Sequence, residues 1–214
     1  PPPVRRLVSW SALKQGVKEE AFYFRQGGRV PNLAGRRDVR MARRVPNVNY
    51  RSTGGNWPGF KQRDNFAVRW NGFVVINRAG SYRFRIESDD GSKLWVDNRY
   101  TINNDGLHGM RGREASRSLV KGQHSMRLEM FERGGHAGMI FKYRGADTGN
   151  RMRVVSGNAL KYVRGKGFLQ QVHYGGRFRN FPNFNRQPSM SSIVSRVAYG
   201  STGGYWPYYQ KRDD

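Results

Sequence analysis

The stretch AGSYRFRIESDDGSKLWVD, residues 79–97, decides the fold class of this chain. Apolar and charged side chains alternate strictly from Tyr82 to Ile86, which is the period of a half-buried β-strand. Asp90-Gly91 is a turn signal, and the apolar run that follows it to Val96 reads as the next strand. The stretch therefore predicts two consecutive strands joined by a tight acidic turn.

Strand signals continue on both sides of this stretch, whereas helical periodicity is weak. Asn71-Gly72 is a two-residue hairpin signal between two apolar runs, and Lys121-Gly122 precedes a second alternating segment. Several short strands with Gly-rich turns favour an all-β antiparallel sandwich or barrel. The further strands are expected at residues 66–70, 73–76, 126–131 and 139–143, and long loops anchored by Tyr50, Trp57 and Phe60 are expected at 24–64.

The chain also repeats itself. Residues 50–65 and 199–214 are identical at nine of sixteen aligned positions, at a spacing of 149 residues. A period of this size is a domain length rather than a solenoid repeat. We therefore expect a linker and the tail of a preceding unit at 1–15, a complete domain at 16–150, a linker at 151–166 and the beginning of a second repeat at 167–214.

The composition is strongly basic. The formal net charge is +24, and arginine outnumbers lysine thirty to nine. Such an imbalance favours an anionic partner: nucleic acid, an acidic membrane surface, a sulfated or acidic glycan, or an acidic protein. A solvated basic surface is the alternative. The absence of cysteine excludes disulfides and thiol chemistry, and no apolar run is long enough to span a membrane.

Four segments in combination resemble the protective-antigen domain family (the PA-fourteen domain). They are residues 64–72, 79–84 and 87–97, and Lys121-Gly122-Gln123-His124 ahead of an alternating strand. The resemblance covers residues 16–150, and its first third starts again at Gly167. It implies an antiparallel β-sandwich or barrel, and a binding or structural module more than an enzyme.

Asp89-Asp90 is the sharpest candidate site. Adjacent carboxylates in a tight turn offer several oxygens to one hard cation, as Ca²⁺ requires. The resemblance implies a precedent in the lectin members of the family. In those members, paired Asp residues and an Asn from another loop hold Ca²⁺, and the Ca²⁺ binds sugar hydroxyls. Asn103 and Asn104 are the matching amides here. The alternative is that both carboxylates only cap the turn through hydrogen bonds to the backbone.

The densest basic run lies in the expected loop region. As phosphate ligands its arginines would give salt-sensitive nucleic-acid binding. No helix-turn-helix, RNA-recognition or zinc-finger signature supports that function, so nucleic acid is the less favoured partner. Docking onto an acidic protein or glycan surface, or exposure to solvent, are the alternatives. The run consists of Arg36, Arg37, Arg40, Arg43 and Arg44.

No catalytic residues are predicted. The histidines His108, His124, His136 and His173 lack metal-ligand spacing, and no nucleophile–base order or phosphate-cradling glycine loop is present. The repeated segment Thr53-Gly54-Gly55 with Trp57-Pro58 is either a ligand loop or, as we favour, a buried packing staple. Structural roles are expected for Trp57, Trp70, Tyr82, Trp95 and Trp206.

The sequence thus predicts a non-catalytic structural and interaction protein of tandem β-sandwich domains. It would be a basic component of a larger assembly, contacting other subunits and acidic partners in a particle shell or an extracellular surface matrix. The alternative is a calcium-dependent carbohydrate-binding adhesin centred on Asp89 and Asp90. No cofactor is required, and calcium is the one that the sequence allows.

Overall fold

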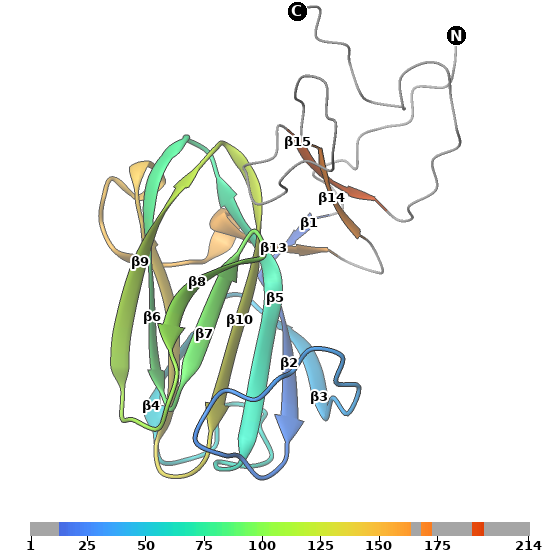
Figure 1. Cartoon of the computed structure of the whole chain (residues 1–214), viewed down its shortest axis with the longest axis vertical. Helices are drawn as coiled ribbons and strands as arrows, with labels where there is room; N and C mark the ends of the chain where they lie inside the picture. The colour runs from blue at the N-terminus through green and yellow to red at the C-terminus, as the bar shows by residue number, and fades with distance from the viewer. Residues whose placement is uncertain (1–12, 164–167, 173–189, 195–214) are drawn as a thin grey trace, which may run out of the picture. The chain divides into compact units, whose positions relative to one another are not determined.

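The computed structural model describes residues 13–163, 168–172 and 190–194. Within residues 13–163, two antiparallel sheets pack face to face (Figure 1). Two further strands, β14 (Phe168–Val172) and β15 (Met190–Val194), pair in a two-stranded sheet of their own. The all-β antiparallel sandwich expected from the alternating segments is confirmed.

The larger sheet has eight strands. Its order along the main path is β1-β13-β5-β10-β7-β8, and β2 pairs with both β5 and β3. The central pair is β5 with β10, which run antiparallel over their whole length. The strands are β1 (Leu13–Gln15), β2 (Val17–Tyr23), β3 (Met41–Val45), β5 (Phe66–Ile76), β7 (Ser92–Val96), β8 (Arg99–Asn104), β10 (Gly122–Glu132) and β13 (Leu160–Val163).

The smaller sheet has five strands in the order β12-β11-β6-β9, with β4 beside β11. Two 3-10 turns, η2 (Ala146–Thr148) and η3 (Gly157–Ala159), connect the last strands of the sandwich. Its strands are β4 (Asn49–Thr53), β6 (Gly80–Asp89), β9 (Arg111–Leu119), β11 (Ala137–Arg144) and β12 (Arg153–Val154).

The core lies between the two sheets and follows the predicted alternation. On β6, the apolar members of the alternating segment are fully buried, while the arginines between them point outward. Trp57, Trp70 and Tyr82 are buried as expected. Trp95 lies on the outer face of the larger sheet, where the Arg127 guanidinium stacks 4.0 Å above its ring. Trp206 lies outside the described residues.

The hairpin predicted at Asn71-Gly72 does not form. Residues 66–76 are one continuous strand, β5, paired without interruption from Phe66↔Glu132 to Ile76↔Gly122. Gly72 serves close approach instead, since a Cβ there would lie 2.7 Å from the carbonyl oxygen of Lys161. The long partner strand β10 and the β-branched and aromatic residues on both sides override the local turn signal.

Residues 24–64 contain two strands that the sequence reading missed, β3 and β4. β3 (MARRV) has two adjacent arginines at its centre and β4 (NYRST) is mostly polar, so neither shows the apolar alternation that marks a half-buried strand. The expected anchors are correct: the Trp57 and Tyr50 rings stack with centroids 4.1 Å apart, and Phe60 packs edge-on against Trp57. The Trp57 indole also donates a hydrogen bond to the Ala137 carbonyl at 3.2 Å. The packing staple therefore joins this segment to β11.

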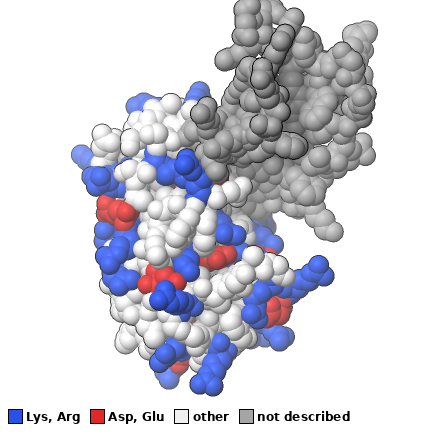
Figure 2. All heavy atoms as spheres, in the orientation of Figure 1, with Lys and Arg blue, Asp and Glu red and all other residues white. Residues whose placement is uncertain are grey.

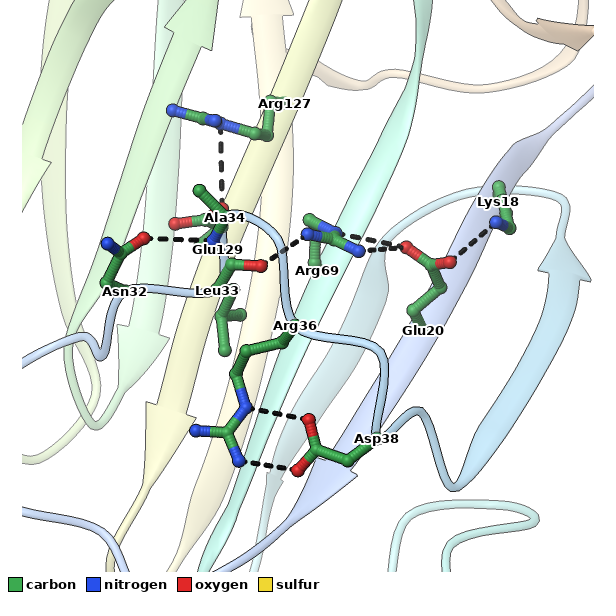
Figure 3. A network of polar contacts seen from close by, with 10 residues as sticks. All are labelled: Lys18, Glu20, Asn32, Leu33, Ala34, Arg36, Asp38, Arg69, Arg127 and Glu129. Atoms are coloured by element: carbon green, nitrogen blue, oxygen red, sulfur yellow. Dashed lines mark hydrogen bonds and ion pairs between the residues drawn. The ribbon is translucent and has the colours of Figure 1, made fainter.

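The loop between β2 and β3 covers part of the outer face of the larger sheet (Figure 3). Beneath it, Leu33 and Phe22 belong to a second small hydrophobic cluster. The Arg69 guanidinium fixes the loop, because it donates to the Leu33 carbonyl at 2.6 Å and to the Glu20 carboxylate at 2.8 and 3.0 Å. Lys18 also pairs with Glu20, at 2.5 Å. Burial alone would raise the pKa of Glu20, but Lys18 and Arg69 hold it below its ordinary value.

Residues 151–163, expected to be part of a linker, contribute β12 and β13 to the two sheets. The repeated segment at 199–214 lies outside the described residues. The tandem array therefore stays a prediction from the sequence.

Candidate functional site

Asp89 and Asp90 lie where β6 ends and turns into β7. Both are almost buried, with 9% and 6% of their surface exposed, and the peptide bond between them is cis. The Asp90 carboxylate accepts hydrogen bonds from two backbone amides, His108 N–H at 3.1 Å and Arg133 N–H at 3.1 Å. Asp90 therefore ties two separate loops to the turn, which is the capping role that the sequence left open.

Glu132, at the end of β10, adds a third carboxyl group to this end of the sandwich. It is fully buried, and neither carboxylate oxygen has a hydrogen-bond partner among the described residues. Burial raises its pKa to about 8, and the charges of Asp90 and Asp89 add to the shift. Burial and the charge of Asp90 likewise raise the pKa of Asp89. We call Asp89, Asp90 and Glu132 the acidic cluster.

Sequence reasoning did not assign Glu132 to this site, although a signal was present. Met126, Leu128 and Met130 occupy alternate positions on the core-facing side of β10, and Glu132 continues the same series. A carboxylate on the apolar side of a strand needs a partner or a function. Glu129 belongs to the opposite face of β10, where it pairs in register with Lys93 and Arg69, so the two glutamates do not share a site.

The loop at 105–110 closes over this end of the sandwich. Asp105 fixes its start, because the carboxylate accepts from Val30 N–H at 2.7 Å and pairs with Lys93 Nζ at 2.8 Å. Further along, the His108 amide binds Asp90. Leu107 and Met110 keep 47% and 38% of their surface exposed, so the loop presents apolar side chains beside the acidic cluster.

Both asparagines predicted as cation ligands use their amides internally. Asn104 accepts from Arg111 Nε at 3.0 Å and donates to Ser88 Oγ at 2.9 Å, in a buried network that also includes Ser92. The Asn103 side chain accepts from Asp105 N–H at 3.1 Å. Asn104 thus braces β6, β7 and β8 near the acidic cluster, and Asn103 shapes the loop that follows β8.

No group of three or more His, Asp or Glu side chains in the described part of the chain has the spacing of a complete metal site. A cation here would therefore need other oxygens, from the backbone, water or a ligand, besides carboxylates. His124 belongs to a separate place in the fold: its ring lies 2.7 Å from the Asp97 carboxylate and 2.9 Å from the Val120 carbonyl. His124 therefore has a structural role at that place and does not contact the acidic cluster.

The arginine run at 36–44 is largely engaged within the domain. Arg36 forms a two-pronged pair with Asp38 and lies 4.0 Å over the Phe24 ring. Arg43 binds the buried Glu19 carboxylate at 2.6 Å, and Arg44 hydrogen-bonds to the Tyr162 hydroxyl. The Glu19 carboxylate also accepts a hydrogen bond from the Trp70 indole. Arg36, Arg43 and Arg44 therefore bind acceptors within the domain.

On the face that Figure 2 shows, lysine and arginine side chains are scattered, with aspartate and glutamate among them. They do not gather into one continuous basic surface there. Among the described residues, no helix is long and apolar enough to cross a membrane.

Comparison with protein-family models matches residues 14–154 to the PA14 domain. The chain belongs to the PA14 domain family. The match is to one domain, and a search of curated proteins gives no match. The family is the one that the sequence motifs indicated.

Solved structures share this PA14 fold at low sequence identity. The PA14 sugar-binding domain of an RTX adhesin superposes with a TM-score of 0.59 at 20% identity, covering 69% of this chain and 98% of that domain. The epithelial adhesin 9 A domain of Candida glabrata, in complex with Galβ1-3GlcNAc, gives 0.53 at 13% identity, covering 72% and 91%.

An anti-sigma factor domain-containing protein gives a TM-score of 0.61 at 18% identity. The match covers 75% of this chain but only 52% of that protein, so the PA14 chain spans about half of its length. Binding domains predominate among these matches, and at such identities they establish the fold.

Proposed function

We propose that this PA14 domain is a non-catalytic, cell-surface carbohydrate-binding module in which Asp89 and Asp90 hold Ca²⁺. The observation that carries the proposal is the acidic cluster, in which a fully buried Glu132 has two oxygens without a hydrogen-bond partner beside two nearly buried aspartates. Burial and mutual repulsion raise the pKa values of Asp89 and Glu132. A divalent cation would offset this repulsion and favour the ionised forms of both groups.

The residues present fit Ca²⁺. It is a hard cation that takes six to eight oxygen ligands in irregular arrangements and accepts backbone carbonyls and water beside carboxylates. Asp89 and Asp90 would hold it. Glu132, whose pKa is about 8 without a cation, would lose its proton as Ca²⁺ binds, and bound Ca²⁺ would supply coordination positions for sugar hydroxyl oxygens.

The chain itself positions the loops around the proposed cation and sugar. Asp90 fixes the loop at 105–110 and the turn that follows β10 through the amides of His108 and Arg133. The same loop exposes Leu107 and Met110, whose apolar surfaces suit the C–H faces of a sugar ring. Related folds support the class of ligand, since one is a sugar-binding domain and another was solved with a disaccharide.

Calorimetric titration of the full chain with Ca²⁺ tests the cation site. Asp89→Asn should weaken binding tenfold or more, because it removes one charged ligand while the Asp90 contacts to both loops remain. Asp38→Asn is the matched control, since it removes the same charge from an exposed ion pair with Arg36 that is distant in sequence from Asp89. A glycan array with Ca²⁺ and with a chelator then tests the ligand class. Absence of heat with Ca²⁺, or glycan binding that persists with chelator, would refute the proposal.

A second candidate is the basic assembly component. It is supported by the net charge of +24 and by the repeat at 199–214, whereas no relative found here belongs to an assembly shell. It predicts self-association or binding to acidic proteins that dissociates as salt rises. Sedimentation at low and high salt measures this directly, and a salt-independent monomer would exclude it.

A further inference from the structure

The outer face of the smaller sheet carries an unusual arrangement of like charges. In the antiparallel register of β6 with β11, Arg83 lies directly opposite Arg144, and Arg85 lies directly opposite Lys142. Side chains at such positions have their Cβ atoms about 5 Å apart, and like charges there destabilise the sheet. We call these four residues the basic block.

Carboxylates neutralise only one half of the basic block. Arg85 is fixed by Glu87 at 2.5 Å and by Glu114 at 2.8 Å, and Lys142 reaches Glu87 at 2.9 Å. The hydrogen bonds to Glu87 and Glu114 raise the pKa of Arg85 above its ordinary value. The ion pairs keep these two cations in place on the sheet.

The other half is compensated more weakly, since Arg83 donates to the Ser116 hydroxyl at 3.4 Å and has one long ion pair. Arg83 is 47% exposed and approaches Glu114 only to 3.7 Å. No carboxylate in the described part of the chain pairs with Arg144. Two guanidinium groups therefore face each other across neighbouring strands and are open to an external anion.

The backbone is adapted to this arrangement at Gly112. On β9, opposite Glu87, a Cβ would collide with the Arg85 guanidinium and lie 2.6 Å from its Cζ. Glycine at this position leaves room for Arg85 to lie across β9 and reach Glu114. Arg85 and Lys142 are thus held by their carboxylate partners, whereas Arg83 and Arg144 are held less.

We propose that the basic block binds a linear sulfated polysaccharide. The block is cationic, lies on an open sheet face, and repeats its charges every second residue along each strand, about 6.6 Å apart, which suits an extended polyanion. The outward positions of β6, β9 and β11 in the described structure carry no aromatic ring, so a nucleobase has nothing to stack on. A polysaccharide therefore fits this face better than a single-stranded nucleic acid.

This site is independent of the cation proposed at Asp89 and Asp90. Arg85 precedes Asp89 by four residues and lies on the same side of β6, but it is held by Glu87 and Glu114, and its ion pairs involve none of the acidic cluster. Binding at the basic block should accordingly persist with chelator. The two proposals can fail separately.

Affinity of the full chain for heparin, used as the sulfated probe, tests the inference in the presence of chelator. The double variant Arg83→Ser/Arg144→Ser should weaken binding about tenfold, because it removes the two guanidinium groups that carboxylates neutralise least. The control Lys61→Ser/Arg99→Ser removes the same charge from exposed positions outside the block and should change affinity less than threefold. Melting temperatures check the fold: the double variant should melt no lower than the wild type, since it relieves repulsion.

Two further binding measurements distinguish the class of ligand. Fully desulfated heparin should bind at least tenfold more weakly than heparin. The affinity for a single-stranded oligonucleotide of matched charge should not change when the basic block is substituted. The proposal is wrong if the block and control variants lose affinity equally, if desulfation has no effect, or if the oligonucleotide binds more tightly and depends on the block.

Discussion

At the scale of single residues, the buried ionisable side chains in the described part of the chain differ in how well they are partnered. Glu19 is fully buried but accepts from Arg43 and from the Trp70 indole, so its burial is compensated. His124 is also buried, and its ring lies between the Asp97 carboxylate and the Val120 carbonyl oxygen. Neither Glu132 oxygen makes a complete hydrogen bond, and the backbone amides of Gly134 and Asp90 only partly offset the rise of its pKa, which makes Glu132 the least compensated of the three.

His124 gives the domain a predictable pH dependence. Burial alone would lower its pKa, but the hydrogen bond and charge of Asp97 raise the pKa above the ordinary value of 6.5. Folding therefore favours the protonated ring, and this stabilisation is fully present below about pH 6.5 and is lost as pH rises through the higher folded-state pKa. Urea unfolding should show a fall in stability over that range.

Asp97→Asn separates this contribution from other titrations. The asparagine keeps an oxygen for the Ser125 amide and tolerates the positive φ of 51°, but it removes the charge that faces His124. We expect a loss of roughly 1.5–3 kcal/mol at pH 6 and a smaller loss at pH 9. An equal loss at both pH values would show that the pair does not depend on the imidazolium.

At the scale of elements, the turn between β6 and β7 is shaped by close packing. Gly91 touches the loop at 105–110, since a Cβ at this position would lie 2.7 Å from the backbone N and O of Gly106 and 2.7 Å from the Phe131 ring. The Gly91 carbonyl also accepts from Phe131 N–H at 3.1 Å. The acidic turn, the loop and β10 therefore form one packed unit.

Gly91→Ala should push the loop away from the turn. We expect a cost of about 1–3 kcal/mol in unfolding free energy, because backbone atoms rather than flexible side chains must move, together with weaker Ca²⁺ binding. Gly109→Ala is the control: it lies in the same loop, has no atom within 4 Å of a Cβ, and should change neither quantity appreciably. Chemical denaturation and Ca²⁺ titration of both variants measure this, and equal behaviour would contradict the packing argument.

At the scale of the whole molecule, charge is the dominant property. Thirty arginines and nine lysines against fifteen aspartates and glutamates give a net charge of +24, and ion pairs such as those of Glu20 and Glu87 neutralise it only locally. Repulsion among the remaining cations destabilises the compact state. Salt screens this repulsion more effectively than it weakens the short buried pairs.

The melting temperature should therefore rise with ionic strength. Going from about 0.01 M to about 0.15 M NaCl should raise it by about 2–4 °C at neutral pH, which corresponds to roughly 1 kcal/mol for a chain of this size. Differential scanning calorimetry of the full chain measures the shift. A melting temperature that falls with salt would mean that surface ion pairs outweigh the repulsion.

The sequence by itself determined the sandwich, because the alternation of apolar and polar residues at Tyr82–Ile86 and Met126–Phe131 predicts which side chains face the core. It also located the acidic turn, since Asp-Asp-Gly is a local signal. Only the tertiary structure decided that Asn71-Gly72 lies in the middle of a strand, that β3 and β4 join the sheets without an alternating pattern, and that Glu132 lies with Asp89 and Asp90. These outcomes depend on pairing between strands distant in the chain, and such contacts outweigh local preference without leaving a periodic signal.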